Sequence, residues 1–392
     1  MAPARFETIV VGLGAHGSAA LYNLAKWGSR VLGIERWEPG HPNGSHHGLT
    51  RITRQCYAEG AAYVPLLKYS FAAYKALERE SKRRLFTRTG VLNVGEPLVA
   101  GALASAREHG LPHQMLDANQ AEARFPGLRV PDGCPVLFEE AGGILEPEAM
   151  VAAHCAVAAY HGATIRTRER VLSWEPLGDG GVAVVTDAGA RYEADRLVLS
   201  PGAWIGKLVP ELAGLVTPQR VTVGWFQPLR PELFTPERLP VWLLQMPGER
   251  HLYGFPIFGG EPGFKIGNFP PDGATDPDTL DRAWRGAADE APLRAALERF
   301  FPEAAGPFLR GGVCMFANTP DGHFLVDTHP RYPQVVLCSA CSGHGFKLSP
   351  AIGLALAELA RHGSCEAFEK EMGLHRLDPA RPGVADALAK FQ

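Results

Sequence analysis

Three glycines near the start of the chain, Gly12, Gly14 and Gly17, are spaced as in a loop that binds the diphosphate of a dinucleotide. In such a loop the first glycine permits a tight turn, the second lets the backbone approach the diphosphate, and the third lets a helix pack on a strand. Glu35 follows roughly 20 residues later, where an acid accepts hydrogen bonds from a ribose 2′-hydroxyl. Because an acid disfavours a 2′-phosphate there, the pattern predicts NAD or FAD rather than NADP. A plain glycine-rich turn is the alternative.

The segments around these glycines are those that such a loop requires. Residues 8–11 are all β-branched, which predicts a strand buried on both faces of a parallel sheet. From Ser18 the apolar residues recur at helical spacing until Gly28, which can end a helix, and residues 31–34 form the next strand. Strand, turn, helix, strand and acid in this order are far more specific for dinucleotide binding than the glycines alone.

The composition is that of an ordinary globular protein large enough for two cores, with 392 residues of which 46% are hydrophobic and 21% charged. A formal charge of −3 without a long Lys/Arg run argues against nucleic acid or an anionic membrane as a partner. No apolar run reaches the length of a membrane span, and the first strand begins too early for a signal peptide, so we expect a cytoplasmic protein. Seven cysteines, an odd number, suggest reduced thiols.

The later pattern predicts two domains that alternate along the chain. Residues 171–174, 181–186 and 191–199 read as a β-meander, which by fold analogy is more typical of a flavoprotein than of an NAD dehydrogenase. Residues 216–316 alternate between apolar and polar in places and predict an antiparallel sheet that can wall a pocket. We therefore expect an α/β fold with two parts: a Rossmann-like FAD-binding domain with a β-meander (1–84, 146–215 and 317–392), and an antiparallel-sheet α+β substrate domain (85–145 and 216–316).

Other elements follow from apolar spacing. Helices are expected at 67–77, 118–125, 150–160, 278–288 and 349–362, and strands at 90–95, 221–226, 264–268 and 334–337. The polar loop 36–54 follows Glu35 directly and should run beside the cofactor, where functional groups are common. His46 and His47 in this loop are adjacent and point apart on most backbones, so we expect no metal site from them.

Three stretches carry a resemblance to a known family. They are the fingerprint Gly12 to Gly17, the loop Gly44-Ser45-His46-His47-Gly48-Leu49-Thr50-Arg51-Ile52-Thr53-Arg54, and the C-terminal pieces Cys314-Met315-Phe316-Ala317-Asn318-Thr319-Pro320-Asp321 and Ser342-Gly343-His344-Gly345-Phe346-Lys347. Together they resemble the monomeric sarcosine oxidase family of FAD-dependent amine oxidases, which also includes N-methyltryptophan and pipecolate oxidases. The resemblance implies oxidation of the C–N bond of a secondary amino acid, with O₂ as acceptor. The products are H₂O₂ and an imine that hydrolyses, giving formaldehyde and glycine from sarcosine.

The resemblance also implies how the cofactor is held. In that family the cysteine matching Cys314 forms a thioether with the flavin 8α-methyl carbon, so we expect a covalent FAD; a buried inert thiol is the alternative. Cys338 and Cys341 form a C-x-x-C with no second pair to complete a zinc site, so we interpret them as packing residues.

Several cations receive roles from the same resemblance. Lys265 matches a lysine near flavin N5, where a positive charge stabilises the superoxide formed when O₂ takes its first electron. Arg54 and Lys347 match the pair that binds the substrate carboxylate, the arginine as a bidentate fork and the lysine as a point charge. Arg51 matches a residue over the flavin face, and Tyr253 one that lines the pocket. For each cation the alternative is a solvated surface charge.

One position departs from the family pattern. The sarcosine-specific members have a histidine four residues after this lysine, where the present chain has Phe269, so we expect a more apolar pocket that favours a bulkier or cyclic secondary amino acid. The complete set of expected site residues is, for catalysis, Lys265, Arg51, Tyr253 and His47; for substrate binding, Arg54, Lys347, Tyr253 and Phe269; and for the cofactor, Gly12, Gly14, Gly17, Glu35, Arg36, Ser45, Thr50, Arg51, Val171, Gly202, Cys314, Gly343, Gly345, Phe346 and Lys347. No metal is expected.

Two further hypotheses remain. An FAD-dependent amino acid dehydrogenase would pass its electrons to an acceptor other than oxygen and would need no cation at Lys265. A non-catalytic or RNA-modifying flavoprotein would use its cofactor differently, and the lack of a basic stripe argues against RNA. Within the oxidase reading, the substrate can be sarcosine, pipecolate or an N-methyl aromatic amino acid. We expect a monomer whose partners are this small amino acid and O₂.

Overall fold

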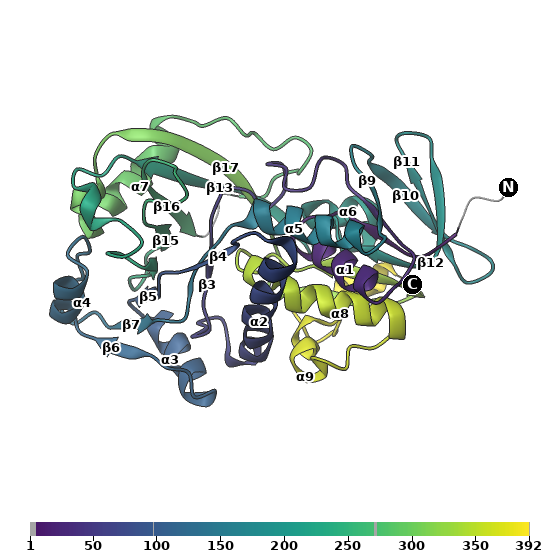
Figure 1. The fold of residues 1–392 in the computed structure, drawn as a ribbon, viewed down its shortest axis with the longest axis horizontal. Helices are drawn as coiled ribbons and strands as arrows, with labels where there is room; N and C mark the ends of the chain where they lie inside the picture. Colours follow the sequence, from purple (N-terminus) through teal and green to yellow (C-terminus); the bar gives the residue numbers. More distant parts are fainter. Residues whose placement is uncertain (1–4, 97, 270–272, 392) are drawn as a thin grey trace.

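The computed structural model describes residues 5–96, 98–269 and 273–391, and two large sheets lie toward opposite ends of an elongated molecule (Figure 1). The first sheet contains β1 (Phe6–Val11), β2 (Val31–Ile34), β9 (Thr164–Arg166), β10 (Val171–Pro176), β11 (Val182–Thr186), β12 (Arg191–Leu199), β18 (Leu325–His329) and β19 (Tyr332–Ser339). Its main path runs β10-β11-β12-β1-β2-β9, and β19 also pairs with β12. Strands β1, β2, β9, β12 and β19 pair in parallel, whereas β10, β11 and β12 form the expected antiparallel meander.

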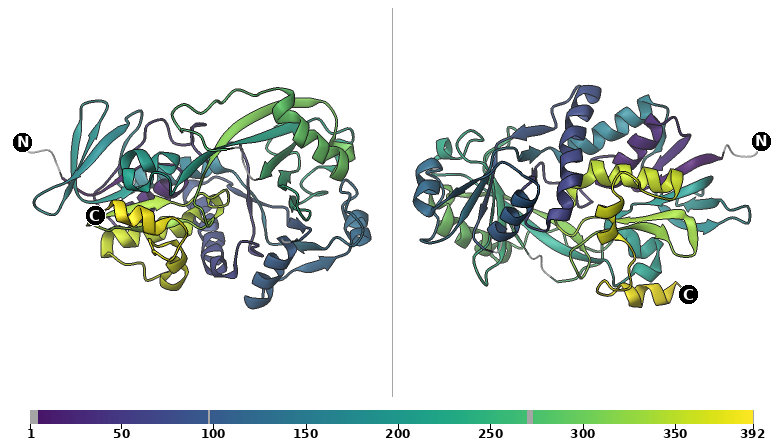
Figure 2. Two further views of the ribbon diagram at one scale, coloured as in Figure 1. Left: turned by 180° about the vertical axis from the view of Figure 1, so that it is seen from behind. Right: turned by 90° about the horizontal axis from the view of Figure 1, so that it is seen from below.

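Four helices cover one face of this sheet: α1 (Ala15–Lys26), α2 (Val64–Ser81), α5 (Pro147–Tyr160) and α8 (Ser349–His362). Successive residues of β1 point to opposite faces, so Val10 packs with α1 and α8 while Ile9 and Val11 join a second core on the other side. Figure 2 shows α1 in purple and α8 in yellow side by side, although they are far apart in sequence. They approach so closely that a Cβ on Gly353 would lie 2.4 Å from the Ala19 Cβ.

The second sheet has the order β17-β13-β16-β15-β14-β5-β7-β6 and is antiparallel except where β14 pairs with β5. Its strands are β5 (Val91–Val94), β6 (Gln114–Leu116), β7 (Val136–Glu139), β13 (Thr217–Phe226), β14 (Val241–Leu244), β15 (His251–Phe255), β16 (Phe264–Phe269) and β17 (Phe308–Asn318). Helices α3 (Leu98–Glu108), α4 (Ala118–Arg124) and α7 (Ala287–Phe300) belong to this end of the molecule (Figure 1). The observed sheets confirm the expected fold class, while the boundaries of the two domains stay a prediction.

A small third sheet lies between the two large ones. It has the order β3-β8-β4 and consists of β3 (Arg51–Thr53), β4 (Phe86–Arg88) and β8 (Gly143–Leu145), all antiparallel. In chain order, β3 ends the polar loop, β4 leads into the second large sheet, and β8 returns to α5. The chain passes between the two large sheets through these strands, and again from β12 to β13 and from β17 to β18. Short helices α6 (Ile205–Leu208), α9 (Glu369–Met372) and α10 (Val384–Lys390) complete the first domain.

The expected helix at 278–288 is wrong. Residues 278–286 form turns, and α7 begins only at Ala287. Gly286 has a φ of 58°, a left-handed conformation that a continuing helix does not contain. The carboxylate of Asp289 accepts a hydrogen bond from the Arg285 backbone at 2.8 Å, which holds the preceding loop in place.

None of the helices in the described ranges combines the length and the hydrophobicity needed to cross a bilayer.

Candidate active site

The turn between β1 and α1 forms one wall of a cavity of about 190 Å³. Gly12 has a φ of 86°, and a Cβ there would lie 2.5 Å from the Ser200 carbonyl oxygen, so only glycine fits. A Cβ on Gly17 would lie 1.9 Å from the Gly12 carbonyl oxygen, in keeping with the close helix packing expected of this glycine. Gly14 lines the cavity and is less crowded. The atom nearest to a Cβ placed on Gly14 would be His46 Nδ1, at 3.6 Å. The backbone of Gly14 can therefore be approached by a ligand.

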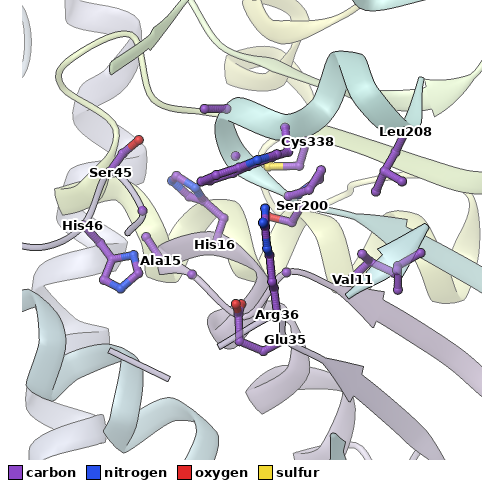
Figure 3. A pocket seen from close by; sticks show the side chains of 18 of the residues that line it. Val11, Ala15, His16, Glu35, Arg36, Ser45, His46, Ser200, Leu208 and Cys338 are labelled. Carbon is purple, nitrogen blue, oxygen red and sulfur yellow. The ribbon is translucent and has the colours of Figure 1, made fainter. Parts of the chain in front are cut away.

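Glu35 is fixed at the end of β2 by the backbone around it. Its Oε2 accepts a hydrogen bond from the Leu13 N–H at 2.8 Å, and its Oε1 accepts one from the Trp37 N–H at 3.0 Å. A carboxylate oxygen has more than one lone pair, so the same oxygens can still accept hydrogen bonds from ribose hydroxyls. In Figure 3 the side chains of Glu35, Arg36 and His16 point into the cavity.

The loop around Asp278, which precedes α7, lies at the rim of this cavity. The Asp278 carboxylate lies 2.7 Å from an Arg36 guanidinium nitrogen and accepts a hydrogen bond from Trp204 Nε1 at 2.9 Å. The Arg36 guanidinium also lies over the Trp37 ring, 4.6 Å from its centroid. These contacts tie this loop to the residues that line the cavity.

The residues present fit the nucleotide end of FAD. The glycine cradle and the fixed acid lie in one cavity, and His46 adds a buried Nε2 that has no hydrogen-bond partner within the described part of the chain. Burial, followed by the charge on His41, lowers the pKa of His46 well below its usual value, so this imidazole is neutral. Of the expected cofactor residues, this cavity is lined by Gly12, Gly14, Glu35, Arg36, Ser45, Val171, Gly202 and Phe346; Gly17 lies behind the turn.

A second cavity of about 510 Å³ shares Ser45, Cys341 and Phe346 with the first, so the two are adjacent. An extended ligand that occupied both cavities would pass these three residues. The remaining expected site residues line this second cavity: His47, Thr50, Arg51, Arg54, Tyr253, Lys265, Phe269, Cys314, Gly343, Gly345 and Lys347.

Lys265 on β16 is only 3% exposed and points into this cavity. Its Nζ donates hydrogen bonds to Thr50 Oγ1 at 2.9 Å and to the Gly48 carbonyl oxygen. The ammonium lies between two rings, 5.1 Å from the Trp225 centroid and 4.8 Å from the Phe255 centroid. Burial lowers the pKa of Lys265 well below its usual value, so an anion bound nearby would favour its charged form.

Arg51 is held by main-chain carbonyl groups of the polar loop. Its guanidinium donates hydrogen bonds to the carbonyl oxygens of Thr50 at 2.8 Å, Ser45 at 2.7 Å and His47 at 2.7 Å. No carboxylate within the described ranges lies at ion-pair distance from it. The loop thus fixes a positive charge beside the cavity. The His47 side chain is neutral as well, because burial lowers its pKa to about 4.

Cys314 on β17 lies where the two cavities meet. Its Sγ is 3.7 Å from the Ser45 carbonyl oxygen and 3.9 Å from that of Gly44. Burial raises the pKa of the thiol, and Arg51 is the first of the cations that oppose this rise. A negative charge on this sulfur would therefore be stabilised mainly by Arg51.

Arg54 is 1% exposed and already has an anionic partner from its own chain. Its Nη2 lies 2.7 and 2.8 Å from the two carboxylate oxygens of Glu59. Although burial raises the pKa of Glu59, Arg54 holds it well below the usual value, so the pair is ionic. The Arg54 Nε is buried without a partner in the described part of the protein, which leaves one arm of the fork for another acceptor.

Lys347 approaches the same place from the turn before α8. Its Nζ donates to the His344 carbonyl oxygen at 2.7 Å and to Tyr57 Oη at 3.3 Å. The Tyr57 ring lies between the two cations, 4.6 Å from the Arg54 guanidinium carbon and 5.0 Å from the Lys347 ammonium. Burial, followed by the charge on Arg54, lowers the pKa of Lys347 to about 7.

The sequence analysis missed several lining residues. Glu59 follows Arg54 closely in sequence, and this proximity was the available signal. His251, Trp225, Phe255 and Arg310 lie on strands of the second sheet, and no motif marked them. Within the described ranges, no group of three His, Cys, Asp or Glu side chains is arranged to hold a metal ion.

Comparisons with known proteins show the family to which the chain belongs. Residues 7–359 match the family of FAD dependent oxidoreductases (DAO). The chain is 40% identical over 390 residues to the monomeric sarcosine oxidase of Streptomyces avermitilis, covering 97% of this chain and 99% of that protein. It is 37% identical to the monomeric sarcosine oxidase of Bacillus sp. strain B-0618, covering 98% of each chain. It is 32% identical to the N-methyl-L-tryptophan oxidase of Salmonella arizonae, covering 91% of this chain and 95% of that protein.

Solved structures share the fold. A variant of NikD, an unusual amino acid oxidase essential for nikkomycin biosynthesis, superposes with a TM-score of 0.81 at 24% identity, covering 95% of this chain and 97% of that chain. The L-proline dehydrogenase from P. horikoshii superposes with a TM-score of 0.79 at 21% identity, covering 94% and 96% of the two chains. At these identities the likeness concerns the fold alone.

Proposed function

Because this chain belongs to the family of FAD-dependent oxidoreductases that includes the monomeric sarcosine oxidases and N-methyl-L-tryptophan oxidases, we propose that it oxidises the C–N bond of a secondary amino acid with O₂ as acceptor. For an N-methyl amino acid, substrate, O₂ and water give the primary amino acid, formaldehyde and H₂O₂. The observation that carries the proposal is that the glycine cradle lies next to a cavity lined by Arg54, Lys347 and Lys265.

FAD supplies the redox chemistry, by taking a hydride equivalent from the substrate at N5 and passing electrons to O₂. The residues of the chain would bind and orient the cofactor and the substrate and would place positive charges beside them. Glu35 and the glycine turn would hold the nucleotide end, and Cys314 would hold the flavin end through a thioether. The position of Cys314 where the two cavities meet supports this attachment.

The substrate carboxylate would bind to Arg54 and Lys347. To do so it must compete with Glu59 for Arg54, because Glu59 occupies one arm of the fork in the ligand-free chain. An arginine offers five N–H donors in a planar arrangement. The unpartnered Nε of Arg54 can therefore donate a hydrogen bond to the substrate carboxylate while Glu59 is still paired with Nη2. Lys265, held away from solvent by Thr50 and two aromatic rings, would stabilise the anion that forms when O₂ is reduced.

The apolar surroundings of Phe269 favour a bulkier substrate as a second candidate. The Phe269 ring lies 4.9 Å from that of Phe316, and a Cβ on Gly343 would lie 2.0 Å from it. This wall suits pipecolate or an N-methyl aromatic amino acid better than a group as small as sarcosine. We further propose that the protein acts as a monomer in the cytoplasm, which the name of its sarcosine oxidase relatives supports for the oligomeric state.

The function is tested by a peroxide assay of the purified protein with sarcosine, N-methyl-L-tryptophan, other N-methyl amino acids and pipecolate. Peroxide formed in equal amount to the imine-derived product supports the oxidase. Reduction of an artificial dye without peroxide indicates the dehydrogenase instead. If none of these amines reduces the flavin, both the oxidase and the dehydrogenase are rejected.

Replacement of Cys314 by serine is expected to release the cofactor from its covalent bond. Acid precipitation should leave the yellow colour in the pellet for the natural protein and in the supernatant for the variant, because the seryl hydroxyl is a far weaker nucleophile than a thiolate. Cys338→Ser provides the matched control, since Cys338 is also buried and lines the nucleotide end of the cavity. A colourless pellet from the natural protein contradicts the thioether.

Binding of a simple carboxylate is expected to weaken as the pH rises above about 7, by up to tenfold per pH unit. In the ligand-free chain Lys347 loses its proton through a pKa of about 7, whereas a bound carboxylate favours the charged form. Propionate titrations followed by flavin absorbance between pH 6 and 9 measure this, because propionate has no amine to titrate. The neighbouring charges on Arg54 and Glu59 do not change over this range, because the pKa of Arg54 is raised and that of Glu59 is lowered. In Lys347→Met, propionate should bind more weakly and independently of pH; the same slope in both proteins contradicts the assignment.

A further inference from the structure

We propose that His251 is a specificity-determining residue that hydrogen-bonds a polar side chain on the Cα atom of the substrate. The preferred substrate is then an N-alkyl amino acid with a polar side chain rather than sarcosine, which has none. This inference rests on the proposed function and deepens it.

The position of His251 follows from the register of two strands. On the ladder between β15 and β16, Phe255 lies opposite Lys265, Tyr253 opposite Gly267, and His251 opposite Phe269. Alternate residues of a strand point to the same face, so these three rows present one wall to the cavity. All of them except Gly267 line it.

The three rows follow one another along the strands, so the wall has one end at Lys265 and another at His251. Each row lies two residues beyond the previous one, so the row of His251 and Phe269 is about 13 Å along the strand from the row of Lys265. The middle row is filled by Tyr253, whose ring covers Gly267: a Cβ there would lie 2.5 Å from it. His251 therefore lies away from the end at which Lys265 would act, so its partner is not the group that reacts with O₂.

His251 lines the cavity, and one of its ring nitrogens has no partner. Its Nε2 is shielded from solvent and has no hydrogen-bond partner among the described residues. The ring packs 5.3 Å from that of Phe269, which offers no acceptor. A buried polar group without a partner is costly, and an aliphatic side chain would pack against Phe269 without that cost. The nitrogen is explained by a ligand group that bonds to it.

The charge state of His251 limits what that group can be. The pKa of His251 is lowered to about 4, mainly by burial; Glu59 opposes this shift, and Arg54 and Lys347 contribute to it. At neutral pH the imidazole is uncharged, so it is a poor counter-ion for a carboxylate. The carboxylate already has Arg54 and Lys347, which lie close enough to influence the same imidazole. The group within reach of His251 is therefore a neutral polar group close to the substrate carboxylate. In an amino acid, the side chain on the Cα atom occupies that place.

N-Methyl-L-serine and N-methyl-L-alanine form the test pair, because they differ by one hydroxyl group. The natural protein is expected to prefer N-methyl-L-serine in kcat/KM by about tenfold, the size of one hydrogen bond to a neutral partner. In His251→Leu this preference should fall below about twofold through a rise in KM for the serine derivative, while the alanine derivative changes little. His251→Gln, which keeps a hydrogen-bonding group, should retain part of the preference.

The exchange variant His251→Phe/Phe269→His is the control for packing. This variant keeps one imidazole and one phenyl ring at the two paired positions, but the imidazole now lies on β16 instead of β15. Its melting temperature should match that of the natural protein while its preference for the serine derivative is lost.

An equal kcat/KM ratio in the natural protein, His251→Leu and the exchange variant overturns the inference, as does a natural protein without preference. If the natural protein makes peroxide from neither compound nor from any amine of the peroxide assay, the proposed function fails instead. Calorimetric binding of the same pair to the natural protein and His251→Leu then decides the role of His251 independently.

Discussion

Replacement of Lys265 by methionine is expected to slow the oxygen half-reaction by about 10²- to 10³-fold, the usual effect of removing one preorganised stabiliser of a developing anion. Reduction by substrate should change by less than about threefold, since Lys265 contacts Gly48 and Thr50 and not the residues proposed to bind the carboxylate. Methionine has a similar length and leaves no charge between the rings of Trp225 and Phe255. Stopped-flow absorbance of the two half-reactions separates the effects.

The control for Lys265→Met is Lys75→Met, which removes an exposed lysine of α2 outside the cavity. Lys265→Arg adds a second comparison, because it retains the charge in a bulkier group. Equal slowing of both half-reactions in Lys265→Met would refute the assigned role. Equal oxygen reactivity of Lys265→Met and the natural protein would do so as well, and would favour the dehydrogenase.

Replacement of Arg54 by methionine is expected to lower kcat/KM by about 10²- to 10³-fold. Removal of one partner from a buried charge pair typically costs about 2–5 kcal/mol, because the other charge stays unpaired. Here the substrate loses its fork and Glu59 loses its partner at once. The loss should appear in KM for the amino acid and in the dissociation constant of propionate, which steady-state and binding measurements give separately.

Glu59→Gln separates the loss of the contact between Arg54 and the substrate from the loss of the ion pair between Arg54 and Glu59. It removes the carboxylate that competes for Arg54, so propionate should bind more tightly than to the natural protein while the ligand-free variant becomes less stable. The double variant should be close to Arg54→Met in propionate binding, because Glu59 acts only through Arg54. The buried pair Arg220–Asp289, at 2.8 Å, is a matched control: Arg220→Met should lower the melting temperature without raising KM. A weaker binding of propionate to Glu59→Gln would contradict the competition.

The nucleotide end of the site could be predicted from sequence because its residues are local. Gly12, Gly14 and Gly17 act within one turn, and the strands and helix beside them have the apolar spacing that defines such elements. The clustering of Arg51, Arg54, Lys265 and Lys347 came instead from the resemblance, since these residues lie on three distant segments.

The parts that could not be predicted depend on contacts between distant segments. His251 faces the cavity opposite Phe269 because of the register of β15 on β16, and a shift by one residue would turn it to the other face. The helix expected at 278–288 was wrong because Gly286 and Asp289 hold a loop whose carboxylate, Asp278, is used at the rim of the other domain. Glu59 was overlooked because an acid beside an arginine in a loop is usually a solvated pair.

The small sheet β3-β8-β4 decides how this protein can be divided. Arg51 is the first residue of β3 and Arg54 follows its last, and β3 pairs with β8 on the segments that connect the two large sheets. The substrate pocket therefore combines two arginines from a connecting segment with side chains of the second large sheet, among them Lys265 and Tyr253. A fragment that contained only the second large sheet would lack both arginines. The position of a bound substrate thus depends on how this connecting segment is held against the second sheet.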